Sequence, residues 1–188
     1  NLKEQFKLSH CTVWTEINKF SRNLISHSVF DWLVDEGSLT AKLVDLSGDN
    51  FKLELQSQER RVISHEEKLI LELSEIDTVI DRKVLLKGRD APWIFAHSLI
   101  PLSSATGDLK VLKNLNNRSL GEFLFKNSSI VRRSLKIAHM EAKSFGIEAE
   151  DIECKERLWG RRSLFSQGRR SLLVSEIFLP ALILEIEK

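Results

Sequence analysis

Hydrophobic and polar residues alternate with a period of two along much of the second half of the chain, which predicts β-hairpins. Residues 79–86 and 92–101 flank one glycine-containing turn, and residues 156–166 and 171–180 flank another. A further strand is expected over 132–140. Antiparallel strands joined by short turns therefore dominate this half of the predicted fold.

The same period is visible earlier in the chain. Phe51, Leu53 and Leu55 alternate with charged or polar residues over 50–56, and a Ser-Gly-Asp turn signal separates this run from residues 40–46. This pattern predicts another hairpin with one solvated face.

Three segments have helical spacing instead, namely 28–35, 107–115 and 119–125. In the last, Ser119 and Glu122 have the S-x-x-E spacing of a capping box. Successive hairpins with separate helices predict the α+β class, with a single antiparallel sheet rather than alternating βαβ units. No glycine-rich phosphate-binding motif is present in the sequence.

Composition narrows the class of protein. With 188 residues, of which 42% are hydrophobic, we expect one domain over 1–188, with residues 1–27 as an extension packed on it or flanking it. The net charge of +1 argues against a nucleic-acid partner. No apolar run is long enough for stable membrane insertion. Cys11 and Cys154 are far apart and lack metal-ligand spacing, which favours a cytoplasmic location.

Glu176 interrupts an apolar strand. By alternation it shares one face with Leu172, Val174 and Phe178, and the other face is also largely apolar. A carboxylate buried in such a strand must be hydrogen-bonded, paired or neutral. Glu176 is therefore a candidate site residue.

Arg82 has the same anomaly, because it shares a face with Ile80, Val84 and Leu86. A guanidinium in apolar surroundings requires an anion. Two interpretations stay open: a structural ion pair between Arg82 and Glu176, or a ligand whose carboxylate binds Arg82 while Glu176 contacts a hydroxyl or ether oxygen.

Five stretches carry a family resemblance: 31–43, 82–104, 118–125, 158–165 and 172–181. They contain D-W-L followed by S-L-T, then R-K-V-L-L, L-G-E-F-L-F, W-G-R-R-S and E-I-F-L-P-A. In order and spacing these motifs resemble the bacterial chorismate pyruvate-lyase family, from about residue 28 to residue 181.

The resemblance implies an antiparallel sheet with helical flaps closing over an internal ligand site. It implies a lyase that converts chorismate into 4-hydroxybenzoate and pyruvate, an early step toward ubiquinone, without a metal or other cofactor. Arg82 and Glu176 would be catalytic, with Glu176 as general acid toward the ether oxygen. Leu120, through its backbone, and Leu39 would also bind the substrate.

Other expectations concern neighbouring residues and the class of protein. Arg161 and Arg162 are expected on a solvated strand, where at most one of them can face inward. Trp32 is expected to pack the first helix onto the sheet. We expect a monomer. The alternative function is a non-catalytic domain of the same fold that binds an effector or a hydroxybenzoate.

Overall fold

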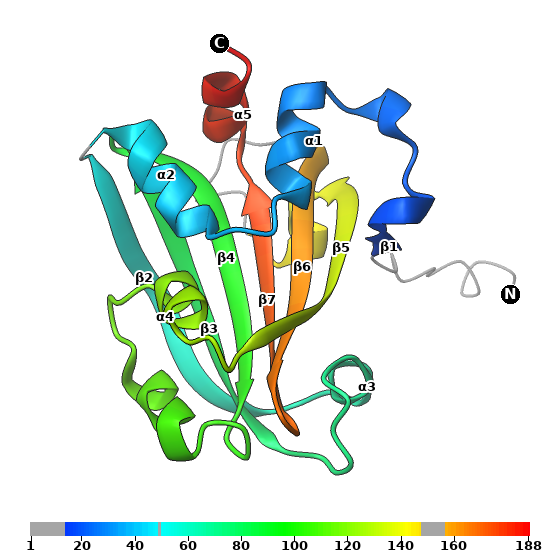
Figure 1. The fold of residues 1–188 in the computed structure, drawn as a ribbon, viewed down its shortest axis with the longest axis vertical. Coiled ribbons are helices and arrows are strands. Elements are labelled where there is room, and N and C mark those ends of the chain that lie inside the picture. The colour runs from blue at the N-terminus through cyan, green and yellow to red at the C-terminus, as the bar shows by residue number, and fades with distance from the viewer. Residues whose placement is uncertain (1–13, 49, 148–156) are drawn as a thin grey trace, which may run out of the picture.

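The computed structural model describes residues 14–48, 50–147 and 157–188. Its centre is a seven-stranded antiparallel sheet with strand order β1-β5-β6-β7-β4-β3-β2 (Figure 1). The predicted α+β class and single antiparallel sheet are confirmed. The strands are β1 (Thr15–Glu16), β2 (Phe51–Val62), β3 (Thr78–Gly88), β4 (Ala91–Pro101), β5 (Val131–Glu141), β6 (Arg157–Gln167) and β7 (Arg170–Phe178).

Short helices lie between several of these strands, and one more follows the last strand. The α-helices are α1 (His27–Val34), α2 (Leu39–Ser47), α3 (His65–Ile70), α4 (Leu120–Lys126) and α5 (Pro180–Ile186). The 3₁₀ helices are η1 (Ile17–Lys19), η2 (Arg22–Leu24), η3 (Gly107–Asn114) and η4 (Ala142–Phe145). None of the described helices is long and apolar enough to cross a membrane.

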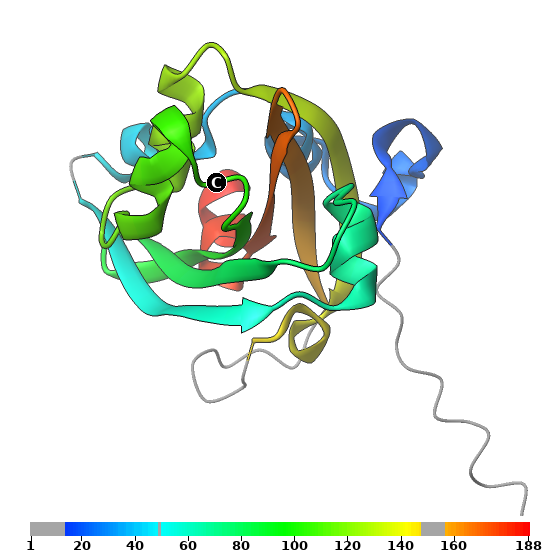
Figure 2. The same ribbon diagram turned by 90° about the horizontal axis from the view of Figure 1, so that it is seen from below.

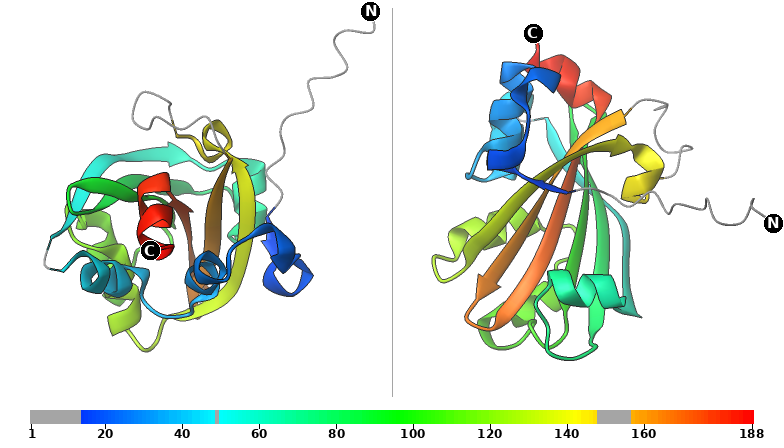
Figure 3. Two further views of the ribbon diagram at one scale, coloured as in Figure 1. Left: turned by 90° about the horizontal axis from the view of Figure 1, so that it is seen from above. Right: turned by 90° about the vertical axis from the view of Figure 1, so that its right-hand side faces the viewer.

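The sheet is strongly curved, so that β2, β3 and β4 form one wall and β5, β6 and β7 form another (Figures 2 and 3). Helices α1, α2, α4 and η3 pack over the concave face, and α3 and η4 pack against the convex face. Both faces of the central strands are therefore covered. A polar side chain that points inward from β3 or β7 must find its partners inside the protein.

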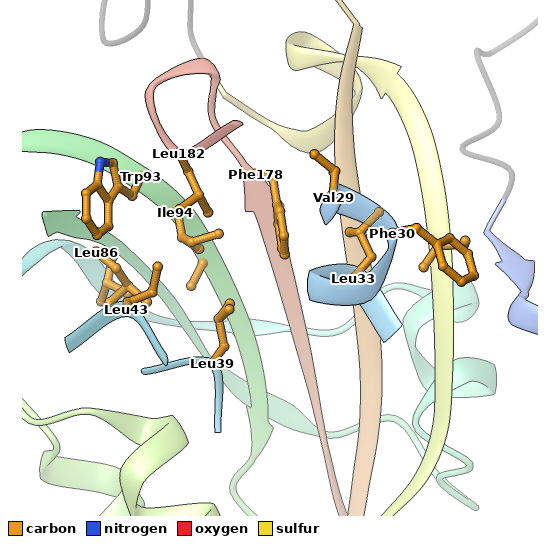
Figure 4. Close-up of a cluster of buried hydrophobic side chains, with 13 residues drawn as sticks. Val29, Phe30, Leu33, Leu39, Leu43, Leu86, Trp93, Ile94, Phe178 and Leu182 are labelled. Atoms are coloured by element: carbon orange, nitrogen blue, oxygen red, sulfur yellow. The ribbon is translucent and has the colours of Figure 1, made fainter. Parts of the chain in front are cut away.

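The largest hydrophobic cluster lies at one end of the concave face, where α1, α2 and α5 meet β3, β4 and β7 (Figure 4). Phe178 and Leu33 are completely buried in it, and Trp93 is 1% exposed. Gly88 allows this close packing, because a Cβ atom at that position would lie 2.2 Å from the Trp93 ring. This cluster fixes α1 and α2 above the sheet and fills that end of the concave face.

The hairpin predicted over 40–56 is wrong, because its first half is helix α2. The Ser38 hydroxyl accepts a hydrogen bond from the Ala41 N–H at 3.2 Å, and the helix ends at Gly48, whose φ is +58°. Leu39 and Leu43 are buried one helical turn apart. Helical spacing and a serine cap therefore outweighed a short apparent alternation, and β2 pairs with β3 instead.

The other predicted strands are confirmed with small shifts. β3 and β4 form the first predicted hairpin, β6 and β7 form the second, and β5 contains 132–140. The last predicted strand ends early, because Pro180 starts α5. Cys11, Cys154 and residues 1–13 of the expected extension lie outside the described residues.

The helix predicted over 119–125 is α4, and the Ser119 hydroxyl accepts from the Glu122 N–H at 3.1 Å. The Glu122 carboxylate binds Lys126, so only one half of the expected capping box forms. The segment 107–115 is largely the 3₁₀ helix η3. Sequence reasoning missed α3, although Ser64 and Glu67 form a complete capping box there.

Candidate active site

A small cavity lies between the concave face of the sheet and the helices α2 and α4. Its volume is about 30 Å³. This is little more than the space one or two waters need, so an aromatic ligand can enter only if the covering groups move. The lining residues that matter for chemistry are Arg82, Arg132, Glu176, Thr40, Ser119 and Leu120.

Arg82 points into this cavity and is 1% exposed. Its Nη2 donates to the carbonyls of Asn116 at 2.9 Å and Arg118 at 3.0 Å. Its Nε is buried without a hydrogen-bond partner, and among the described residues no carboxylate forms an ion pair with the guanidinium. Burial lowers the pKa of Arg82 to about 10. The site therefore holds a desolvated cation that has no counterion in the described part of the chain.

Glu176 points into the same cavity from β7, as strand alternation predicted. Its direct neighbours are Ala96 on β4 and Arg161 on β6. Arg161 Nε donates to Glu176 Oε2 at 2.6 Å. Glu176 and Arg82 lie two strands apart, on the order of 10 Å from the usual strand spacing. The structural Arg82–Glu176 pair, one of the two open interpretations, is therefore not formed.

Arg161 corrects another expectation, because it lies on a buried strand and is only 1% exposed. Its Nη1 donates to the carbonyl of Asp35 at 2.8 Å and to that of Trp32 at 3.3 Å, at the end of α1. Trp32 itself packs against the hydrophobic cluster, as predicted. Arg162 faces the opposite side of the sheet, over the Trp14 ring. Only one of the two arginines faces inward, which confirms the parity argument.

Sequence reasoning did not single out Arg161 or Arg132 as site residues. The available signal for Arg161 was its parity, which it shares with Ser163 and Phe165 on the buried face of β6. Arg132 gave no such signal, because a β-bulge follows it and interrupts the alternation. Its position on the cavity wall depends on how β5 folds against β6.

The structure separates the two leucines expected at the site. Leu120, the first residue of α4, lines the cavity and is 5% exposed. The Leu39 side chain lies in the hydrophobic cluster, and the neighbouring Thr40 lines the cavity instead. The geometry therefore brings Arg82, Glu176 and Leu120 together, while Leu39 supports α2 from behind.

Helices α2 and α4 meet directly above the cavity. The hydroxyls of Thr40 and Ser119 are 3.0 Å apart and share a hydrogen bond. Gly121 allows this approach, because a Cβ atom there would lie 2.9 Å from Thr40 Oγ1. This contact joins the two helices that cover the cavity.

No group of three or more histidine, cysteine or acidic side chains suited to a metal ion occurs among residues 14–48, 50–147 and 157–188. The convergent groups are instead guanidinium, carboxylate, hydroxyl and main-chain groups. Such a set suits an anionic organic ligand that also carries a hydroxyl or ether oxygen.

Solved structures with a similar fold share little sequence with this chain. The C-terminal domain of the histidine utilization repressor from Pseudomonas syringae matches with a TM-score of 0.53 and 14% identity, over 70% of this chain and 92% of that one. PhnF from Mycobacterium smegmatis matches with a TM-score of 0.59 and 11% identity, over 79% of this chain and 66% of that one. These likenesses show the fold alone.

Sequence comparison identifies the family. A probable chorismate pyruvate-lyase from Pseudomonas aeruginosa is 36% identical over 170 residues, covering 90% of this chain and 92% of the relative. A second, from Psychromonas ingrahamii, is 36% identical over 179 residues and covers 93% of each chain. The family model for chorismate lyase matches residues 8–187. The chain therefore belongs to the chorismate lyase family.

Proposed function

We propose that this member of the chorismate lyase family converts chorismate into 4-hydroxybenzoate and pyruvate, the step that provides 4-hydroxybenzoate for ubiquinone synthesis. The observation that carries the proposal is the buried Arg82 guanidinium, which has no counterion among the described residues and shares a small cavity with Glu176. A ligand with a carboxylate at one end and an oxygen function at the other satisfies both groups.

The reaction is an elimination that makes the ring aromatic. The bond from ring C3 to the ether oxygen breaks, and its electron pair leaves with the enolpyruvyl group. The hydrogen at C4 departs as a proton, and the enolpyruvate takes up a proton at its methylene carbon to become pyruvate. Because aromatisation supplies the driving force, positioning, electrostatics and proton handling are the main tasks of the protein.

Arg82 is suited to bind the ring carboxylate. Its Nη2 is already held by the Asn116 and Arg118 carbonyls, which fixes the plane of the guanidinium. Its buried, unpartnered Nε is free to donate. A carboxylate bound there would gain a charge-assisted hydrogen bond and supply the missing negative charge.

Glu176 is suited to the other end of the ring. The 2.6 Å contact with Arg161 Nε is a charge-assisted hydrogen bond that fixes the position of Glu176 Oε2. We assign Glu176 as the group that contacts the ring hydroxyl and accepts the proton lost from C4, a role that differs from the general acid expected from the sequence. Arg161 would hold the carboxylate in position and stabilise its charge.

The alternative of a non-catalytic ligand-binding domain shares the fold but predicts no turnover. The test is to mix the protein with chorismate and follow 4-hydroxybenzoate by absorbance or chromatography. Glu176→Gln should lower kcat by roughly 10²- to 10⁴-fold. Arg82→Ala should weaken chorismate binding by roughly 10- to 150-fold, the loss expected for a charge-assisted bond.

Arg89→Ala serves as the matched control, because this arginine lies on the surface and pairs with Glu185. It should leave turnover unchanged. Near-normal turnover by folded Arg82→Ala and Glu176→Gln would overturn the site assignment, and absence of turnover in the unmodified protein would overturn the activity. A monomeric state, a cytoplasmic location and independence of cofactors stay predictions, to be checked by sedimentation, cell fractionation and assay after chelation.

A further inference from the structure

Arg132 lines the same cavity as Arg82 and Glu176 but approaches it from another wall. It lies on β5, whereas Arg82 lies on β3, and the strands β6, β7 and β4 separate them in the sheet. Because the sheet is curved (Figure 2), inward side chains from β3 and β5 converge on one cavity. Two guanidinium groups are thereby available to opposite ends of a single ligand.

Aromatic rings and a carbonyl fix the position of the Arg132 head group. Its Cζ lies 5.4 Å from the ring centre of Phe125 and 5.1 Å from that of Phe165, and both rings also line the cavity. Its Nη1 donates to the Asp35 carbonyl at 3.2 Å. Attraction between the cation and the two rings holds the guanidinium in place before any ligand arrives.

The same guanidinium also has one N–H group that lacks a hydrogen-bond acceptor among the described residues. Arg132 Nε is buried and has no hydrogen-bond partner in the described part of the chain. Burial lowers the pKa of Arg132, and the charge of Arg161 lowers it further, while Glu176 and Glu36 offset part of the effect. An added anion would supply an acceptor and reduce the repulsion between the two arginines.

Chorismate carries two carboxylates, and the proposed function assigns only the one on the ring, to Arg82. Arg82, Arg132 and Arg161 bring three positive charges to the cavity and its wall, and Glu176 brings one negative charge. The balance of three minus one is +2, which matches a dianion. The second carboxylate belongs to the enolpyruvyl group, on the ether oxygen whose bond breaks.

We propose that Arg132 binds the enolpyruvyl carboxylate of chorismate from the β5 wall of the cavity. This inference rests on the proposed function and adds a residue to its site. The carboxylate departs with pyruvate when the ether bond breaks, so 4-hydroxybenzoate keeps no group for Arg132. Arg132 therefore favours the substrate over the aromatic product, whereas Arg82 binds both.

The experiment compares two ligands by calorimetric titration, without turnover. The first is 3-(1-carboxyvinyloxy)benzoate, an aromatic and unreactive ligand that keeps both carboxylates, and the second is 4-hydroxybenzoate. Arg132→Gln should weaken binding of the dianionic ligand by roughly 10- to 100-fold, because one charge-assisted contact is lost. Binding of 4-hydroxybenzoate should stay nearly unchanged. In turnover, the same variant should raise KM for chorismate without changing inhibition by 4-hydroxybenzoate.

Two control variants complete the design. Arg133→Gln removes the neighbouring arginine, which is exposed and pairs with Glu72, and should change neither affinity. Arg82→Gln should weaken the binding of both ligands. Equal losses for the two ligands in Arg132→Gln, or no loss for the dianion, would overturn the proposal. If Arg132→Gln does not fold, Arg132→Lys is judged by the same ratio of losses.

The titrations also separate this proposal from the activity itself. If the dianion binds through Arg132 but the unmodified protein does not convert chorismate, the proposed function is refuted and the assignment of Arg132 is supported. If the protein converts chorismate but its affinity for the dianion does not depend on Arg132, the proposed function is supported and the assignment of Arg132 is refuted.

Discussion

Glu176 and Arg161 are direct neighbours across β7 and β6, and the Oε2 of the glutamate lies 2.6 Å from the Nε of the arginine. The arginine side chain is 1% exposed and the glutamate side chain 15% exposed. Through Arg161 Nη1 this pair also reaches the Asp35 carbonyl, next to the end of α1. The carboxylate in the cavity is thus held by the same guanidinium that binds main-chain carbonyls at the end of α1.

Removing one partner of this pair should destabilise the fold more than removing both. Arg161→Met leaves the glutamate buried and unpaired, and should cost roughly 3–5 kcal/mol of unfolding free energy. Adding Glu176→Gln to that variant should restore part of the loss, because no uncompensated charge stays buried. Urea unfolding of the two single variants and the double variant measures the coupling, and strictly additive losses would refute the importance of the pair.

The hydrogen bond between Thr40 and Ser119 should retain the product. A small cavity covered by α2 and α4 predicts that product release limits turnover. Thr40→Val removes the bond between α2 and α4, worth about 1 kcal/mol, and should speed release of 4-hydroxybenzoate by about fivefold. Stopped-flow displacement of bound 4-hydroxybenzoate measures this rate. Thr40→Ser keeps the hydroxyl and is the control, and equal release rates in both variants would contradict the prediction.

Asp81, on the convex side of β3, should make the free energy of unfolding depend on pH in the acidic range. Burial alone would raise its pKa, but hydrogen bonds and charges from His97 and Arg61 outweigh burial and hold the pKa at about 2. Because the folded pKa lies below the unfolded value of about 3.9, the stabilisation is present above that value and is lost as the pH falls toward 2.

Asp81→Asn should therefore lower the unfolding free energy by about 2 kcal/mol near neutral pH, and the difference should vanish near pH 2. Urea unfolding of both proteins across this range checks the prediction. Glu59→Gln is the matched control, because Glu59 is the partner of Asp81 on β2 and its side chain is exposed. A stability difference that does not change with pH would contradict the assigned cause.

Strand alternation is a local property of the backbone, which explains what the sequence revealed about the cavity. It identified Arg82 and Glu176 as inward charges without knowledge of any neighbouring strand. The hairpins of β3–β4 and β6–β7 were predictable for the same reason, since short turns join consecutive strands. The family motifs added the expected chemistry, because they span most of the chain.

Only the tertiary structure decided which groups meet. Glu176 pairs with Arg161 rather than Arg82 because β7 lies between β4 and β6, and such long-range order has no local signal. Arg132 reaches the cavity because the whole sheet is curved and β5 closes its far wall. Residues 40–46 became helical because Leu39 and Leu43 pack into the cluster that the helices and sheet build together. The sequence by itself determined that Arg82 and Glu176 face inward, and the packing of the sheet determined their partners and brought Arg132 to the same cavity.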